Sequence, residues 1–288
     1  MTEDLSHFFT AIDEQADIRQ GDVIFRSVSQ PTPAQEYGII ANADCDLAQK
    51  KNGGTFTWLK VVPLSQYYDN HWAPEKAAKI IEKQLNGILT STNSQIARIN
   101  SKLKPLDDTK LISWVTSDGA ESIIKVLDSA KHPMTEDLKA KLRAIDLLTA
   151  RDGHEVGIKE LKKAAPLLKI HGDTIKSDME KAFSNSGGFP DYFVLPELPS
   201  TKGIGFIALL RELSVVQASD VYKTELEARI ADSPTAFRRI GRLSDRVRYG
   251  IMQKLGFLFM RIGDHPSFES ACKASYGIVI EEITGAEK

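Results

Sequence analysis

The chain has 288 residues, of which 42% are hydrophobic, so it is long enough to bury a substantial core as one large domain or two smaller ones. Its formal net charge of −2 excludes a general electrostatic attraction to nucleic acid or anionic membranes, and leaves such binding to local patches. The first residues are acidic where a signal peptide is basic, and no run of about eighteen apolar residues occurs. We therefore expect a cytoplasmic protein with no membrane partner. Two cysteines are too few for a disulfide framework.

The N-terminal part is predicted to hold one helix and three strands. Apolar residues at helical spacing in 4–15 indicate a short amphipathic helix. A turn at Gln20 leads into a first strand, residues 31–36 are expected to form a loop, and 37–41 form a second strand that is nearly all apolar and therefore buried on both faces. Residues 55–64 give a third strand. Three such strands make half of a small barrel, whose open edge needs partners from later in the chain.

Those partners are predicted within residues 190–222, where a β-rich run at 191–196 and an apolar run at 204–216 flank a turn and suit a hairpin. The residues between the two sets of strands show helical patterns. Pro74 is suited to the first turn of a helix, and an apolar stripe continues from there to Leu103. Further helical patterns lie at 119–131, 135–150, 157–170 and 173–184.

The C-terminal part, residues 233–288, is predicted to hold a basic helix and a short strand. Ser233-Pro234 indicates a helix start, an apolar stripe predicts a helix over 246–262, and 276–283 suit a strand. Five arginines accompany the helix and are candidates for partner binding: Arg238, Arg239, Arg242, Arg246 and Arg248. Three roles stay open for them, namely ion pairs with acidic neighbours in the same chain, contacts with a protein partner, and contacts with nucleic-acid phosphates.

The most distinctive stretch, residues 37–47, ends in a cysteine between two carboxylates: Asp44, Cys45 and Asp46. The two negative charges disfavour the thiolate that a nucleophile needs, and on a strand Asp44 and Asp46 point to the face opposite Cys45. We expect Cys45 to be a small core residue and the aspartates to accept backbone hydrogen bonds. A catalytic or metal role for the aspartates, or a nucleophilic Cys45, are the alternatives. No histidine pair has metal-ligand spacing and no phosphate loop occurs, so no cofactor or metal is predicted.

The segments Gln20-Gly-Asp-Val-Ile, 37–47 and Leu59-Lys-Val-Val-Pro-Leu-Ser resemble the opening of the SH3-like barrel of PemK-like toxin endoribonucleases. The resemblance implies that fold, and it places Ser65 at the family's hydroxyl position near the cleavage site. The family's phosphate-stabilising arginine has no counterpart, because Gln35-Glu36 occupies its place. Arg19 and Arg242 are the candidates to supply it.

A second resemblance involves both ends of the chain. The tripeptide Cys45-Asp-Leu, the segment 239–249 and Phe259-Met-Arg-Ile-Gly resemble a set of uncharacterised bacterial proteins with the same motifs, often from mobile or antiviral gene clusters. We therefore expect an α+β protein in which an SH3-like antiparallel β-barrel, residues 17–66 and 190–222, is interrupted by an α-helical insertion, 72–186, and followed by the C-terminal helix. The expected function is non-catalytic recognition: an adaptor of a bacterial defence or toxin–antitoxin system that binds a protein partner. The alternative is a PemK-like endoribonuclease or an RNA-binding protein that uses the C-terminal basic patch.

Overall fold

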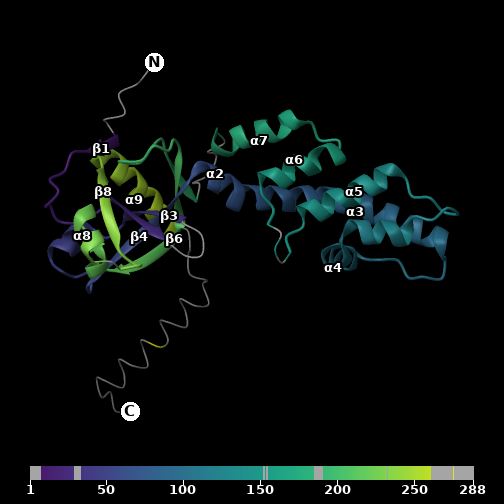
Figure 1. Cartoon of the computed structure of the whole chain (residues 1–288), viewed down its shortest axis with the longest axis horizontal. Helices are drawn as coiled ribbons and strands as arrows, with labels where there is room; N and C mark the ends of the chain where they lie inside the picture. Colours follow the sequence, from purple (N-terminus) through teal and green to yellow (C-terminus); the bar gives the residue numbers. More distant parts are fainter. Residues whose placement is uncertain are drawn as a thin grey trace, which may run out of the picture. The chain divides into compact units, whose positions relative to one another are not determined.

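The computed structural model describes residues 8–28, 34–151, 153, 155–184, 191–231, 233–260 and 275. The chain divides into two compact units, whose elements are labelled in Figure 1. The sheet unit comprises Met1–Lys60, Phe189–Phe193 and Ala208–Lys288, and the helical unit comprises Val61–Gly188 and Val194–Ile207. In the part of the chain that is described, no helix combines the length and the apolar character needed to cross a membrane.

The strands form one curled, mainly antiparallel sheet, which with the helices confirms the predicted α+β class (Figure 1). Their order is β1-β8-β2-β3-β4-β6-β5, and β7 pairs with β8 in parallel. The strands are β1 (Phe9–Thr10), β2 (Asp22–Val28), β3 (Ala34–Ile40), β4 (Thr55–Pro63), β5 (Tyr192–Leu195), β6 (Phe206–Gln217), β7 (Val221–Tyr222) and β8 (Phe237–Leu243). The strands predicted near 37, 55, 191 and 204 are confirmed, although β3 also takes in Ala34–Glu36, which the sequence had suggested to be loop.

The core of the sheet unit is packed around Trp58, whose indole lies 5.2 Å from the ring of Phe237, measured between ring centroids. Ile24, Ile40 and Phe56 also belong to this cluster. Gly38 lies directly under the indole, since a Cβ at this position would stand 2.4 Å from Cε3 of Trp58. The strand can therefore pass the indole only because residue 38 has no side chain.

Two predictions for this unit are wrong. In the described part of the predicted N-terminal helix, Phe9 and Thr10 form β1, because Phe9 pairs with Leu243 of β8 and that pairing satisfies its backbone. Residues 11–15 are not helical. The helix start predicted at Ser233 is a turn, in which the Thr235 amide donates to Ser233 Oγ at 3.3 Å, and it leads into β8. The predicted C-terminal helix is confirmed as α9 (Asp245–Phe259), whereas the predicted strand at 276–283 lies outside the described residues. Two short helices, α1 (Asp44–Ala48) and α8 (Glu225–Ala231), also belong to this unit.

The helical unit begins with α2 (Leu64–Tyr67) and a π-helical turn, η2 (Tyr68–Trp72), which continue into the long helix α3 (Ala73–Ile99). The helices α4 (Asp108–Leu127), α5 (Glu136–Leu148), α6 (Ile158–Leu167) and α7 (Gly172–Ser184) follow. The helices predicted to begin near 74, 135, 157 and 173 are confirmed. Helix α4 begins earlier than the predicted 119, because Asp107 caps it by accepting from the Lys110 amide at 2.9 Å. The pattern predicted only its second half, which follows a non-helical Gly119 with φ 75°.

Two apolar clusters hold these helices together. The first is built around Ile88 of α3 and includes Leu111, Val115, Ile123 and Leu142 from α4 and α5. The second is built around Ala73 and Ala77 of α3 and includes Leu148 and Leu161 from α5 and α6. Because α3 contributes to both, it is fixed along most of its length and offers a rigid outer face.

Candidate functional site

Cys45 is exposed, so the prediction that it is a core residue at a strand end is wrong. After β3 ends at Ile40 the chain turns into the short helix α1, in which the Leu47 amide donates to the carbonyl of Ala43 at 3.1 Å. The alternation expected of a strand therefore does not apply to Asp44, Cys45 and Asp46. The thiol lies 3.7 Å from Oδ1 of Asp46.

Asp44 joins α1 to two other segments of the sheet unit. Its Oδ1 accepts from the Gln20 amide at 2.9 Å, and its Oδ2 accepts from the Arg248 guanidinium at 2.6 Å. Burial tends to lower the pKa of Arg248, but its hydrogen bond to Asp44 and the negative charges of Asp44 and Asp245 outweigh burial and raise it. The stem of Arg248 fills the space beside Gly21, which has φ 84° and where a Cβ would lie 2.8 Å from Cδ. Asp44 and Arg248 thus join α1, α9 and the start of β2.

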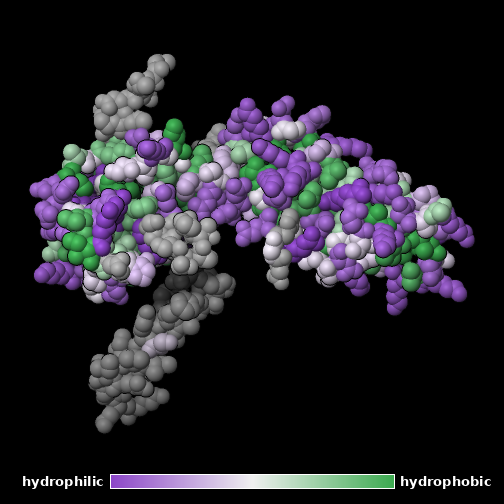
Figure 2. Space-filling model, viewed as in Figure 1, coloured by the Kyte–Doolittle hydropathy of each residue, from purple (hydrophilic) through white to green (hydrophobic). Residues whose placement is uncertain are grey.

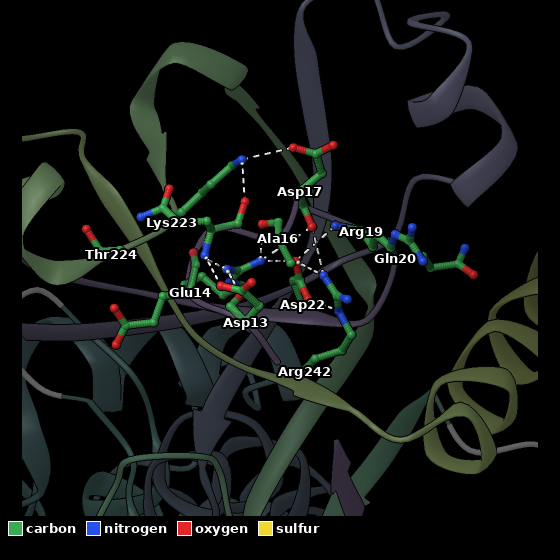
Figure 3. Close-up of polar contacts among 12 residues, drawn as sticks. Asp13, Glu14, Ala16, Asp17, Arg19, Gln20, Asp22, Lys223, Thr224 and Arg242 are labelled. Atoms are coloured by element: carbon green, nitrogen blue, oxygen red, sulfur yellow. Dashed lines mark hydrogen bonds and ion pairs between the residues drawn. The ribbon is translucent and has the colours of Figure 1, made fainter. Parts of the chain in front are cut away.

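Figure 3 shows a second polar network, centred on the fully buried Asp22 of β2. Arg242 of β8 donates to both oxygens of this carboxylate, at 2.5 and 3.0 Å, and the Arg19 amide donates to Oδ2 at 2.9 Å. Arg239, whose side chain is 2% exposed, lies 3.5 Å from the same oxygen. Its guanidinium also donates to the carbonyls of Asp13, Glu14 and Ala16. The network therefore fixes residues 13–17 against β8.

The other predicted arginines differ in their surroundings. Arg238 lies on β8, 3.1 Å from a carboxylate oxygen of Glu225 and 5.2 Å from the centre of the Phe25 ring. Arg238, Arg239 and Arg242 thus belong to a strand, not to the helix that the sequence indicated. Arg246 is exposed on α9 and makes no hydrogen bond or ion pair within the described residues. Four of the five arginines are therefore held by groups of the sheet unit itself.

Ser65 is exposed in α2 and belongs to the helical unit, whereas Asp44, Cys45, Asp46 and the five arginines belong to the sheet unit. Among the residues that the structure describes, no three histidine, cysteine, aspartate or glutamate side chains come close enough to hold a metal ion.

The helical unit carries an open groove of about 750 Å³ that the sequence analysis missed. Its walls come from η2, α3, Ile112 of α4, the end of α5 and the residues that follow α5. Six of the apolar residues that line it are Pro74, Ala78, Ile81, Leu85, Leu148 and Val156. Helix α3 supplies four of these at spacings of four, three and four residues, which places them on one face. The sequence signal was present, because the apolar stripe of α3 is wider than a single helix contact requires.

The charged residues of the groove are all acidic. Asp69, Glu82 and Glu155 line it, and none of its described lining residues is basic. Asp69 accepts from the Ile158 amide at 3.0 Å and so stabilises the start of α6. Glu82 and Glu155 are exposed and form no ion pair among the described residues. The groove therefore combines an apolar surface with a negative rim. Figure 2 shows hydrophobic patches among the hydrophilic side chains of the helices in this unit.

No family model, curated protein or solved structure matches the chain. The resemblances to PemK-like toxins and to the bacterial Cys-Asp-Leu proteins therefore stay predictions from the sequence.

Proposed function

We propose that the protein is a non-catalytic recognition or adaptor protein, and that the groove of the helical unit receives its protein partner. The observation that carries this proposal is the groove itself: a cavity of about 750 Å³, lined mainly by apolar side chains, left open on a helix that the core fixes in place. Exposed apolar surface costs about 25 cal/mol per Å², a cost that a bound partner removes. Because α3 is already packed on both clusters, the groove needs no rearrangement before it binds.

The proposal includes an SH3-like barrel for the curled sheet, a helical insertion for the helices between β4 and β5, and a role in a bacterial defence or toxin–antitoxin system. The resemblances described above support these three points.

The contacts of Arg242 support recognition over RNA cleavage. Its guanidinium donates twice to the buried carboxylate of Asp22, so it already has an anionic partner and is engaged in the fold.

A tryptophan in the groove is expected to block partner binding. Ala78 is exposed and lines the groove, so Ala78→Trp fills the groove without entering the core. We expect the amount of partner that co-purifies with the tagged full chain from its own cells to fall at least about tenfold, which corresponds to about 1.4 kcal/mol of binding free energy. Quantitative mass spectrometry of the purified complexes measures the change.

The matched control is Ala97→Trp, which places the same side chain on the same helix at an exposed position outside the groove. It should leave the partner bound. Equal co-purification with both variants would contradict the proposal. Cleavage of single-stranded RNA by the purified wild-type chain, lost in Ser65→Ala, would also overturn the non-catalytic assignment.

A further inference from the structure

We infer that the segment bound in the groove is a cationic amphipathic helix of about three turns. The inference rests on the proposed function and adds the chemistry of the partner to it. Three features of the groove carry it: its length along α3, its acidic rim, and the hydrogen bonds within the protein that engage the Thr149 hydroxyl and Asp69 Oδ1.

The length follows from the residues of α3 that line the groove. Pro74 and Leu85 are eleven positions apart, so the groove follows α3 for about 16 Å at 1.5 Å per residue. A helix of about three turns has the same length. Apolar side chains at positions i, i+4, i+7 and i+11 of such a helix would face Pro74, Ala78, Ile81 and Leu85, as one helix packs its ridges against the grooves of another.

The sign of the charge follows from the rim. Asp69 lies before the start of α3, Glu82 lies near the other end of the groove, and Glu155 lies after α5. Lysine or arginine side chains at both ends of a bound helix would meet these carboxylates, whereas an acidic helix would be repelled. Glu82 and Glu155 have no cation among the described residues to displace, so the bound helix gains these contacts without breaking others.

The polar groups favour a peptide over a small polar ligand. Sites for small ligands hold a few polar groups that converge on the ligand from an apolar floor. Here the Thr149 hydroxyl of the groove donates to the Ile145 carbonyl at 2.7 Å, and Asp69 Oδ1 accepts from the Ile158 amide. The other uncharged polar side chain of the lining, Asn70 of η2, is exposed to solvent. The charged groups of the groove are thus the carboxylates on its rim, where the flanking side chains of a bound helix would lie.

The test is a selection of 16-residue peptides from a random display library on the immobilised full chain. We expect enriched peptides with apolar residues at helical spacing and with lysine or arginine on the flanks.

Fluorescence anisotropy of an enriched peptide should show that Glu82→Lys and Glu155→Lys each weaken binding about fivefold, the upper range for exposed ion pairs. The dependence of the affinity on salt should also decrease in each variant, because one ionic contact is lost. Glu180→Lys, an exposed position on α7 outside the groove, is the control and should change neither quantity.

The outcomes separate this inference from the proposed function. Enrichment of neutral or acidic peptides that are displaced by Ala78→Trp would overturn the cationic helix and leave the groove as the partner site. Affinities that are unchanged in both Glu82→Lys and Glu155→Lys would also overturn the cationic character of the bound helix and leave the groove as the partner site. Enriched peptides whose binding is unaffected by Ala78→Trp would overturn the groove and, with it, the proposed function.

Discussion

Replacing Asp22 by asparagine is expected to lower the free energy of unfolding of the sheet unit by about 3–5 kcal/mol. Asp22 is fully buried and accepts two hydrogen bonds from Arg242. Its carboxylate also lies 3.5 Å from the Arg239 guanidinium, which is itself 2% exposed. The neutral amide would leave buried positive charge without a counter-charge, and its NH2 group cannot accept the hydrogen bonds made by the carboxylate. The loss should therefore exceed that of an ordinary surface ion pair.

Urea unfolding followed by the fluorescence of Trp58 measures this loss of stability in the sheet unit. The chain has three tryptophans, and Trp72 and Trp114 belong to the helical unit, so Trp72→Phe/Trp114→Phe gives a background in which Trp58 reports alone. Asp17→Asn is the control in the same network (Figure 3): its carboxylate is 89% exposed. The Lys223 hydrogen bond and charge hold the pKa of Asp17 below its usual value, yet water screens the pair, so little change in stability is expected. A similar small change in Asp22→Asn would contradict the account of the buried network.

Gly38→Ala is expected to destabilise the sheet unit by about 1–3 kcal/mol, or to prevent its folding. The new Cβ would stand 2.4 Å from Cε3 of Trp58 and 3.1 Å from Cγ1 of Ile24. The indole is rigid and sits in the centre of the core, so it cannot move away without opening a cavity elsewhere. The same urea experiment measures the effect.

The control for Gly38→Ala is a glycine at which an added methyl group meets no other atom. Gly87 lies exposed within α3, and a Cβ there would meet nothing within 4 Å. Gly87→Ala should therefore stabilise the helical unit by about 1 kcal/mol, because alanine favours the helix. A Gly38→Ala protein as stable as the wild type would show that the indole does not occupy the position described.

The sequence predicted elements whose local pattern matched their tertiary surroundings. The strand before Asn42 and the helix α3 are examples, since apolar residues at strand or helix spacing were also the buried ones. Predictions failed where a distant segment decided the conformation. Phe9 sits in a helical pattern, yet it pairs with Leu243, more than two hundred residues away. The strand at residues 237–243 is not predicted, because its arginines give it the character of a basic surface segment, whereas in the structure Arg238, Arg239 and Arg242 each lie beside a carboxylate of the same unit.

The candidate site was harder to predict than the fold. Cys45 is prominent in the sequence because of its two acidic neighbours, but the chain leaves the sheet before it and exposes the thiol. Arg239 and Arg242 form part of a basic run, but the buried partner that engages them, Asp22, lies far away in sequence. The groove has no motif. The wide apolar stripe of α3 is its one local signal, but the groove also depends on where α4 and the end of α5 lie in space, which the sequence of α3 does not contain.

The central claim is that a protein partner occupies the groove of the helical unit, and site-specific photo-crosslinking tests it most directly. A benzophenone amino acid at position 78 lies in the groove, and the same residue at position 97 lies on α3 outside it. Irradiation of cells that make the protein should give one discrete crosslinked product from position 78 and none from position 97. Absence of a product at position 78, or the same products from both positions, would contradict the claim.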